Sequence, residues 1–398
     1  MEKILVVGTL PKEVGGRYTQ GICNVVYELS KHPLSKFEVH ILAVNTPDKF
    51  AAKINRNDNI YYHGYRISII SILLQVLLHP FRTITMCHNY QKISNMSALR
   101  ALLYYDMLKK IIKKEKPVVI HSHCIHLSYL INVITKGKIP LVVTFHGLFT
   151  GKNNCLDVIS KSKDFIDFET GLTDETVERL QQVGFISESI YKISNGVDES
   201  KFQYSESDRN ELRKKLGVLD DQVVFITVAS LQERKGQLKF IKKIENANLK
   251  YQYWILGTGP DLNIIQDYVN QHDLNDYVKL IGYVKNTELY KYYSAADIYA
   301  HTSTEEGQSL AEIEAYTLGM KILVSEDLRG TIVNDTSDHN TYCFFDFNNF
   351  DYNRVETWSN EKALNRETKH KFDWKIISEE YNKAYQDICR RFYKKWGK

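Results

Sequence analysis

The chain has 398 residues, which is too long for one ordinary hydrophobic core and predicts two domains of similar size. Its hydrophobic share of 43% and charged share of 25% exclude a disordered or low-complexity chain. The net charge of +4 is too small to indicate binding to nucleic acid. The 6 cysteines have no CxxC spacing, so they predict neither a zinc site nor a disulfide framework and suit a cytoplasmic protein.

The first half of the chain alternates apolar runs with helical patterns. A strand-like run at 4–7, which no cleavable leader precedes, is followed by a glycine-bearing turn and a helical pattern at 18–29. Further strand-like runs occur at 37–43, 118–121 and 141–145. Continuous apolar strands that alternate with helices are typical of a parallel sheet covered on both faces.

The segment 66–116 is basic and contains the most apolar stretch of the chain. Its cations include Arg66, Arg100 and the lysines between 109 and 116, and only Asp106 and Glu115 oppose them. The apolar stretch ISIISILLQVLL at 67–78 is shorter than the ~20 residues that a spanning helix needs. Two interpretations stay open: a peripheral contact with an anionic membrane surface, which we favour, or a solvated helix face beside a core segment.

A second α/β series begins near residue 222. Strand-like runs at 223–230, 251–256, 278–282, 297–302 and 321–325 alternate with helical patterns, and a last helical pattern covers 373–392. We therefore predict an α/β fold with two facing Rossmann-like domains, 1–190 and 191–372, each built on a parallel sheet. The segment 373–398 is expected to form a helix that packs back on the first domain.

The segment TEEGQSLAEIEAYTLG, at 304–319, lies between two of these strands. Ser309 and Glu312 have the spacing of a capping box, which predicts a helix that starts at Leu310. Gly319 is expected to cap its carboxyl end. This role for Glu312 leaves two other acids for a ligand.

Those two acids are Glu306, on the loop before the helix, and Glu314, in its second turn. Carboxylates accept hydrogen bonds from sugar and ribose hydroxyls, and the free amides at a helix amino terminus bind phosphate. A sugar nucleotide carries both kinds of group. The alternative is that both glutamates are exposed charges at a helix end.

The spacing of these acids resembles the E-x7-E signature of glycosyltransferase family 4, also described as glycosyl transferases group 1. Other motifs resemble the family in its order: GG at 15–16, HSH at 121–123, LVVTFHG at 141–147, ISNGVDESKF at 193–202, ASLQERKG at 229–236 and FDWKIISEEYNKAY at 372–385. The likeness spans nearly the whole chain. It implies the GT-B fold and retaining transfer of a sugar from a nucleotide sugar, expected to be UDP-linked, without metal or other cofactor.

The resemblance also implies roles for the matching residues. In catalysis, it implies that His123 reaches the sugar near the reacting carbon, Lys235 stabilises the leaving diphosphate, and Glu306 holds hydroxyls of the transferred sugar. The implied acceptor contacts are Arg17 and His146, whereas we interpret the other nearby histidines as structural. The implied donor-binding residues are Gly16, Arg234, Lys235, Tyr283, Val284, Glu306, Gly307, Gln308, Ser309, Leu310 and Glu314.

The departure from the family pattern that matters most is at position 230, and Glu312, where the family usually has an apolar residue, is a smaller one. Ser230 stands where the family has an arginine that binds the diphosphate. Arg234, next to Lys235, is the cation that can compensate.

The expected acceptor is a saccharide or an undecaprenyl-type lipid-linked saccharide, in the synthesis of capsule, O-antigen or a similar cell-surface polysaccharide. The protein is then expected in the cytoplasm, peripheral to the membrane. Two alternatives stay open: a catalytically weak GT-B partner or glycan-binding subunit, and a GT-B sugar-nucleotide epimerase or phosphorylase. A dehydrogenase is disfavoured because GTGP at 257–260 lacks the full dinucleotide fingerprint.

Overall fold

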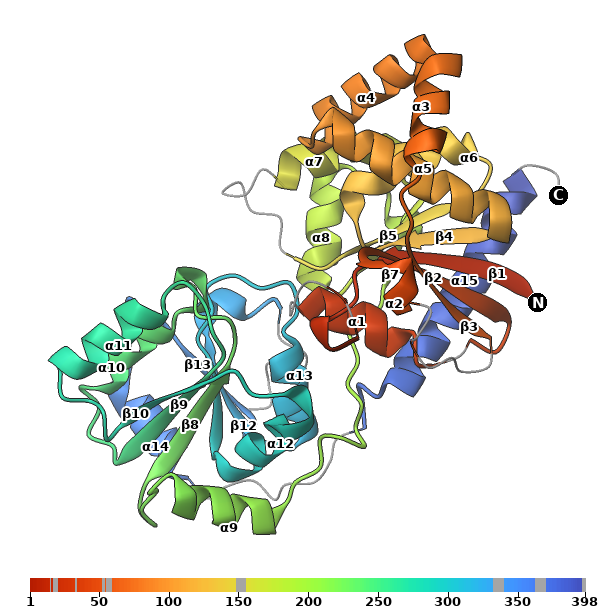
Figure 1. The fold of residues 1–398 in the computed structure, drawn as a ribbon. Helices are drawn as coiled ribbons and strands as arrows, with labels where there is room; N and C mark the ends of the chain where they lie inside the picture. Colours follow the sequence, from red (N-terminus) through yellow and green to blue (C-terminus); the bar gives the residue numbers. More distant parts are fainter. Residues whose placement is uncertain are drawn as a thin grey trace. The chain divides into compact units, whose positions relative to one another are not determined.

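The computed structural model describes residues 1–14, 16, 21–32, 34–51, 54, 59–147, 155–331, 340–361 and 370–395. The chain forms two compact units, and most of their helices and strands are labelled in Figure 1. Unit 1 comprises Met1–Asn195 with Trp374–Lys398, and unit 2 comprises Gly196–Asp373.

The described strands of unit 1 form one parallel sheet. They are β1 (Glu2–Gly8), β2 (Phe37–Pro47), β3 (Ile60–Tyr65), β4 (Val119–Ser122), β5 (Leu141–Phe145), β6 (Phe168–Gly171) and β7 (Ile190–Lys192). Their order is β3-β2-β1-β4-β5-β6-β7, so the direction of winding reverses between β1 and β4. Because β7 belongs to this sheet, unit 1 extends past residue 190, where the sequence placed the boundary.

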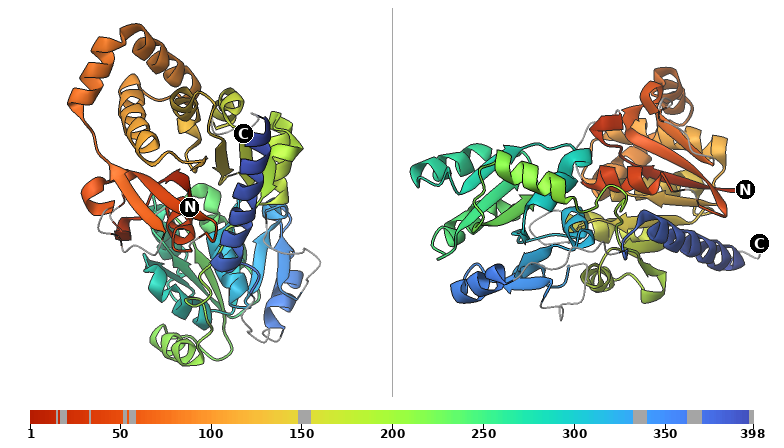
Figure 2. Two further views of the ribbon diagram at one scale, coloured as in Figure 1. Left: turned by 90° about the vertical axis from the view of Figure 1, so that its right-hand side faces the viewer. Right: turned by 90° about the horizontal axis from the view of Figure 1, so that it is seen from below.

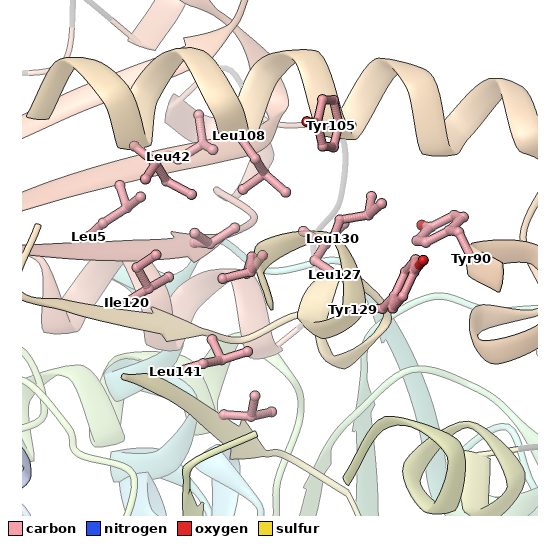
Figure 3. Close-up of a cluster of buried hydrophobic side chains, with 14 of the residues drawn as sticks. Leu5, Leu42, Tyr90, Tyr105, Leu108, Ile120, Leu127, Tyr129, Leu130 and Leu141 are labelled. Carbon is pink, nitrogen blue, oxygen red and sulfur yellow. The ribbon is translucent and has the colours of Figure 1, made fainter. Parts of the chain in front are cut away.

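Helices connect these strands and cover the sheet. They are α1 (Gly21–Leu29), α2 (Asp48–Ala51), α3 (Ile69–Leu78), α4 (Pro80–Ser94), α5 (Ala98–Glu115), α6 (Ser128–Thr135), α7 (Cys155–Ser162) and α8 (Asp174–Val183). Figure 3 shows part of the core between helix and sheet, where Leu108 of α5 and Leu130 of α6 lie with Leu5 and Ile120 of the strands. All four are fully buried, which contributes roughly 1.5–3 kcal/mol each.

The carboxyl-terminal helix α15 (Trp374–Lys395) belongs to unit 1, as the sequence predicted. Its Tyr385 hydroxyl lies 2.6 Å from Nδ1 of His121 in β4, and Asp387 accepts a hydrogen bond from the Tyr191 hydroxyl of β7 at 2.6 Å. Both views of Figure 2 show α15 alongside the strands of unit 1. The packing of this helix on the first domain is thereby confirmed.

Helices α3 and α4 stand apart from the sheet of unit 1 (Figure 2). No residue of α3 is buried, although most of its residues are apolar. Within the described chain, no single helix has the length and apolar character to cross a membrane. Only α3 and α4 taken together do, and they are bent by 110°.

The described strands of unit 2 form a second parallel sheet. They are β8 (Val223–Val228), β9 (Tyr251–Leu256), β10 (Val278–Gly282), β11 (Ile298–His301), β12 (Lys321–Ser325) and β13 (Tyr342–Phe345). The helices of the unit are α9 (Glu206–Lys215), α10 (Gln237–Ile244), α11 (Leu262–Gln271), α12 (Asn286–Ala295), α13 (Leu310–Thr317) and α14 (Tyr352–Asn360). The order β10-β9-β8-β11-β12-β13 is that of a Rossmann fold, with the reversal between β8 and β11.

Candidate functional site

Three of the candidate residues lie where the strand order reverses. In unit 1, His123 directly follows β4. In unit 2, Lys235 follows β8 and Glu306 follows β11. Parallel sheets bind ligands beyond the carboxyl ends of their strands at such reversals, because loops from the two directions diverge there.

In unit 2, Lys235 and Glu306 form an ion pair through Nζ and Oε1. Their side chains are only 14% and 13% exposed. Ser303 donates a hydrogen bond to the same Glu306 oxygen at 3.1 Å, and a guanidinium nitrogen of Arg234 lies 3.8 Å from Oε2. Burial raises the pKa of Glu306, but the attraction of Lys235 and the other nearby cations outweighs it and lowers the pKa below its usual range.

The backbone fixes this pair through Gly236. Gly236 has φ +69°, and a Cβ at this position would lie 2.0 Å from the carbonyl oxygen of Thr302. The Thr302 hydroxyl donates to the carbonyl of Lys235 at 2.6 Å, and the Thr304 amide donates to that of Arg234 at 2.9 Å. The loop after β8 is therefore held against the loop after β11, which brings Lys235 to Glu306.

The predicted start of α13 is confirmed. The helix begins at Leu310, and the Ser309 hydroxyl accepts a hydrogen bond from the Glu312 amide at 3.3 Å. Gly319 follows the helix with φ +65°, as expected of a residue at this end.

The explanation given for Glu312 was wrong in part. Its carboxylate is fully buried, 3.1 Å from Nδ1 of His301 and 3.4 Å from the Tyr342 hydroxyl. A capping box explains its backbone amide but not this side chain, which points into the core of unit 2. His301 on β11 and Tyr342 on β13 therefore contact α13 through the Glu312 side chain.

Glu314 lies in the second turn of α13, as expected, but it is 9% exposed and already has a partner. The hydroxyl of Tyr293, on α12, donates to its Oε2 at 2.8 Å. Glu306 is likewise paired, so neither acid is a free surface charge. A carboxylate can accept about four hydrogen bonds, and each therefore keeps capacity for ligand hydroxyls.

The other proposed donor residues also lie in unit 2. Tyr283 and Val284 follow β10, and Tyr283 is 55% exposed. Gly307, Gln308 and Leu310 occupy the loop and first turn of α13 between the two glutamates. Ser230 follows β8, where its carbonyl accepts a hydrogen bond from the side chain of Gln237.

The histidines of unit 1 form a connected group. Both ring nitrogens of His121 have a hydrogen-bond partner, the Tyr385 hydroxyl and the Thr144 hydroxyl, each at 2.6 Å. This fits the interpretation of His121 as structural. Nδ1 of His123 lies 2.7 Å from Nε2 of His146. Nε2 of His123 is buried and has no hydrogen-bond partner among the described residues. Burial, and then the neighbouring histidines, lower the pKa of His123 well below its usual value, so that it is neutral at pH 7.

At the amino-terminal loop of unit 1, Gly16 donates its amide to the Pro11 carbonyl at 2.9 Å. A Cβ on Gly16 would lie 1.7 Å from the carbonyl oxygen of Leu10, so this tight turn itself requires glycine. Arg17 and Gly15 lie outside the described residues.

Sequence comparison assigns both units to one family. Residues 19–201 match the description "Glycosyltransferase Family 4", and residues 208–348 match "Glycosyl transferases group 1". The chain belongs to glycosyltransferase family 4. This family 4 chain is 31% identical over 134 residues to the alpha-monoglucosyldiacylglycerol synthase of Acholeplasma laidlawii, covering 32% of the chain and 33% of that relative.

A second curated relative is named UDP-Gal:alpha-D-GlcNAc-diphosphoundecaprenol alpha-1,3-galactosyltransferase, from Escherichia coli. It is 26% identical over 256 residues, which is 61% of this chain and 64% of the relative. The family 4 chain therefore spans between a third and two thirds of the length of these two relatives.

Solved structures match the chain over almost its full length. Sucrose-phosphate synthase of Thermosynechococcus elongatus has a TM-score of 0.70 at 16% identity, covering 98% of this chain and 99% of that one. Anabaena HepE in complex with UDP and glucose has a TM-score of 0.65 at 15% identity, covering 97% and 100%. At such identities the likeness shows the fold alone, and the fold is GT-B, as the sequence predicted.

Sequence reasoning did not find several residues of the site. Tyr293 and Ser303 each bond one of the two glutamates, and His301 lies beneath α13. Serine at the end of a strand is too common to single out. The histidine at the end of the DIYAH run was the available signal, because a strand buried on both faces seldom carries one.

Proposed function

We propose that the chain is a retaining glycosyltransferase, which moves a sugar from a UDP-linked donor to a saccharide or lipid-linked saccharide during synthesis of cell-surface polysaccharide. The observation that carries this proposal is the ion pair of Lys235 and Glu306 at the strand reversal of unit 2. A mostly buried cation beside a mostly buried carboxylate suits a ligand that has both phosphate and hydroxyl groups.

Unit 2 is proposed to bind the donor. Lys235 pairs with the diphosphate and stabilises the charge that develops as it leaves. Glu306 accepts hydrogen bonds from hydroxyls of the transferred sugar, and Glu314 from those of the ribose. The amides of Ser309 and Leu310, at the amino end of α13, face phosphate oxygens. Arg234 supplies the second cation where Ser230 replaces the family arginine, since its guanidinium already lies beside Glu306.

Transfer then needs no oxidant or other co-reactant. The bond between the anomeric carbon and the diphosphate oxygen breaks, and the acceptor oxygen forms its bond on the same face of the sugar. The acceptor proton passes to the departing phosphate oxygen. His123, from unit 1, offers a neutral ring whose Nε2 has no described partner, which suits a hydrogen bond to a sugar hydroxyl rather than the role of a cation.

The acceptor is proposed to be bound by unit 1 and to be attached to a membrane lipid. The names of both curated relatives include a lipid, diacylglycerol in one and diphosphoundecaprenol in the other. In unit 1, α3 and α4 expose Ile70, Leu77 and Phe81 by 74%, 75% and 86%. Such a row of apolar side chains on a basic segment suits the interface of an anionic membrane, where apolar side chains insert and cations attract.

The anchoring of α3 supports this interpretation. Asp106, buried in α5, accepts a hydrogen bond from the Ser71 hydroxyl of α3 at 2.5 Å and pairs with Lys110 at 2.6 Å. The polar side of α3 is therefore tied to unit 1, while its apolar residues remain exposed. Helix α3 is thus held in place while its apolar face stays exposed to solvent.

A donor screen tests the enzymatic proposal. The purified chain is incubated with UDP-, GDP- and ADP-linked sugars, with and without short saccharide and polyprenyl-diphosphate saccharide acceptors. We expect transfer, or slow hydrolysis of the donor, with at least one UDP-sugar. Conversion of the donor into an isomeric nucleotide sugar without acceptor would identify an epimerase instead. No reaction with any donor contradicts the proposal.

Ser230 favours one alternative, a GT-B partner with weak or no catalysis, because it removes a cation from the diphosphate site. Calorimetric titration with UDP separates the two functions. An enzyme is expected to bind UDP, and to bind it less tightly when Lys235 is replaced by alanine. If the chain is a scaffold, neither the parent nor the Lys235→Ala variant is expected to show heat of UDP binding.

A further inference from the structure

Two histidines and a glutamate meet on one face of the sheet in unit 1, away from the strand reversal. His40 lies on β2, His63 on β3, and Glu115 is the last residue of α5. Strands β2 and β3 are two and three positions from β4, which places them about 10 and 14 Å from it along the sheet. His123 follows β4, so this group is separate from the proposed transfer site.

Atoms of the three side chains that can bind a metal all lie within 4.8 Å of one another. Nδ1 of His40 lies 2.9 Å from Nε2 of His63 and 3.4 Å from Oε2 of Glu115, and Nε2 of His63 lies 4.0 Å from Oε1 of Glu115. Ligand atoms at about 2.0–2.1 Å from a tetrahedral ion are about 3.3 Å apart. The separations of His40 Nδ1 from His63 and from Glu115 are close to this spacing, and the contact of His63 with the other Glu115 oxygen is wider, at 4.0 Å.

Neighbouring groups prepare His40 for this role. Its other nitrogen, Nε2, lies 2.6 Å from the Glu38 carboxylate, which fixes the proton there and leaves Nδ1 as the acceptor. The ring also stacks on Tyr61, at 5.0 Å between centroids, and lies edge to edge with the nearly parallel ring of His63, at 5.2 Å. A carboxylate behind a ligating histidine is the usual second layer of a zinc site.

Two lysines compete with a metal ion for the carboxylate of Glu115. Lys3 and Lys114 each lie 3.0 Å from a Glu115 oxygen, and they neutralise it when no ion is bound. Lys114 is 70% exposed, so it can swing into solvent when a metal takes its place. Lys3 keeps a second partner in Glu38, 3.4 Å away.

We propose that His40, His63 and Glu115 bind one divalent transition-metal ion, of which zinc fits the donor set best, with solvent as the fourth ligand. The ion is structural, because it ties the end of α5 to the edge of the sheet far from the reacting groups. The residues are 23 and 52 positions apart in sequence (63 − 40 and 115 − 63), so no spacing motif announces them.

The test uses the full chain without a histidine tag, stripped with chelator and then titrated with Co²⁺ as a visible probe. We expect one equivalent to bind with the absorption of four-coordinate cobalt, and Zn²⁺ to displace it. Excess Zn²⁺ is expected to raise the midpoint of thermal unfolding by roughly 5 °C or more. Failure to bind one equivalent overturns the proposal.

Variants locate the ion. His63→Gln is expected to weaken Co²⁺ binding by at least about 100-fold, and Glu38→Gln, which keeps all three ligands, by about 10- to 100-fold. His272→Gln is the matched control, because His272 in unit 2 also lies beside a glutamate, Glu245, at 3.4 Å. If circular dichroism shows that His63→Gln does not fold, Glu38→Gln decides. If the folded variants bind Co²⁺ as tightly as the parent, the ion occupies a surface site elsewhere, and the proposal is overturned.

Discussion

The ammonium group of Lys235 and the carboxylate of Glu306 form an ion pair between two loops that are 71 residues apart in the chain. Both side chains are mostly buried, so each charge offsets the desolvation of the other. A nucleotide sugar offers substitutes for both partners, a phosphate for the lysine and a hydroxyl for the glutamate. The pair is therefore a stable resting arrangement that a donor can replace without leaving either charge alone.

Replacing Lys235 tests its proposed role in the departure of the diphosphate. Lys235→Ala is expected to lower kcat by about 10²–10³, because it removes a cation from the point where negative charge develops. It also leaves Glu306 buried without its nearest cation, which lowers the melting temperature. Steady-state kinetics and thermal unfolding measure the two effects separately.

Lys239→Ala is the control, since Lys239 is exposed on the adjoining helix α10. It is expected to change neither kcat nor the melting temperature. A Lys235→Ala protein that folds normally and retains full kcat would remove this residue from the mechanism.

Gly236 offers a test of the loop geometry. Gly236→Ala places a methyl group 2.0 Å from the Thr302 carbonyl oxygen, at a φ of +69°. We expect the two loops to separate, with a loss of several kcal/mol of stability and most of the activity. Gly217 has nearly the same φ, +68°, but open space around it, so Gly217→Ala should cost only about 1 kcal/mol. Equal losses in denaturant unfolding of the two variants would contradict the close approach.

Much of this architecture was accessible from sequence, for physical reasons that particular segments illustrate. Strands β1 and β5 are runs of mostly apolar residues, and Ser309 marks the start of α13 as its capping residue. The reversal points follow once the strands are placed in Rossmann order. Strand β6, with the sequence FETG, was missed because it is short and half polar, although all of its residues are buried.

Side-chain partners could not be predicted in the same way. The Glu312 carboxylate faces His301 and Tyr342, from strands β11 and β13, and no local spacing reveals such a contact. Local capping rules correctly described the backbone amide of Glu312 and misplaced its side chain. The pairing of His40 with His63 likewise depends on strand register, which a single sequence does not fix.

The pH dependence of stability is expected to reflect Glu169, a buried residue of β6. Burial raises its pKa from 4.5 to about 8, although Ser189 donates a hydrogen bond to it. Below pH 4.5 both the folded and unfolded chains hold this proton. As the pH rises toward 8 only the unfolded chain releases it, so the free energy of unfolding falls by up to about 1.4 kcal/mol per pH unit.

Glu169→Gln removes this ionisation and keeps an acceptor for Ser189. Its melting temperature is expected to exceed that of the parent at about pH 7.5 and to match it at about pH 4.5. Glu178→Gln, on the exposed side of α8, serves as control and should leave the pH profile unchanged. A Glu169→Gln profile parallel to that of the parent would mean that the buried carboxyl does not titrate in this range.

His123 is expected to act without changing its protonation. Because its pKa is held well below the usual value, the profile of kcat/KM between about pH 6 and 8 should show no inflection due to this residue. His123→Ala is expected to lower kcat about tenfold at every pH in that window, the worth of one hydrogen bond. An inflection near neutrality that disappears in His123→Ala would instead identify it as an acid or base.

The exposed faces of α3 and α4 predict binding to anionic membranes. The double variant Leu77→Ser with Phe81→Ser is expected to weaken sedimentation with vesicles that contain phosphatidylglycerol by at least about 100-fold, since each side chain loses its insertion into the interface. Leu219→Ser is the matched control, because Leu219 is 61% exposed in unit 2. Binding of the parent should also fall with added salt, as the basic residues of 66–116 require.

Size-exclusion chromatography of the same proteins distinguishes a membrane from a second copy of the chain as the occupant of this face. A membrane-binding face leaves parent and variant at the same elution volume in the absence of lipid, and the double variant alone loses the vesicles. The opposite result has two parts: the parent is an oligomer and the double variant a monomer, and vesicles of neutral lipid bind the parent as well as anionic ones do. In that case the apolar residues of α3 and α4 pack against those of a second copy of the chain. The acceptor would then have to reach unit 1 without help from these helices.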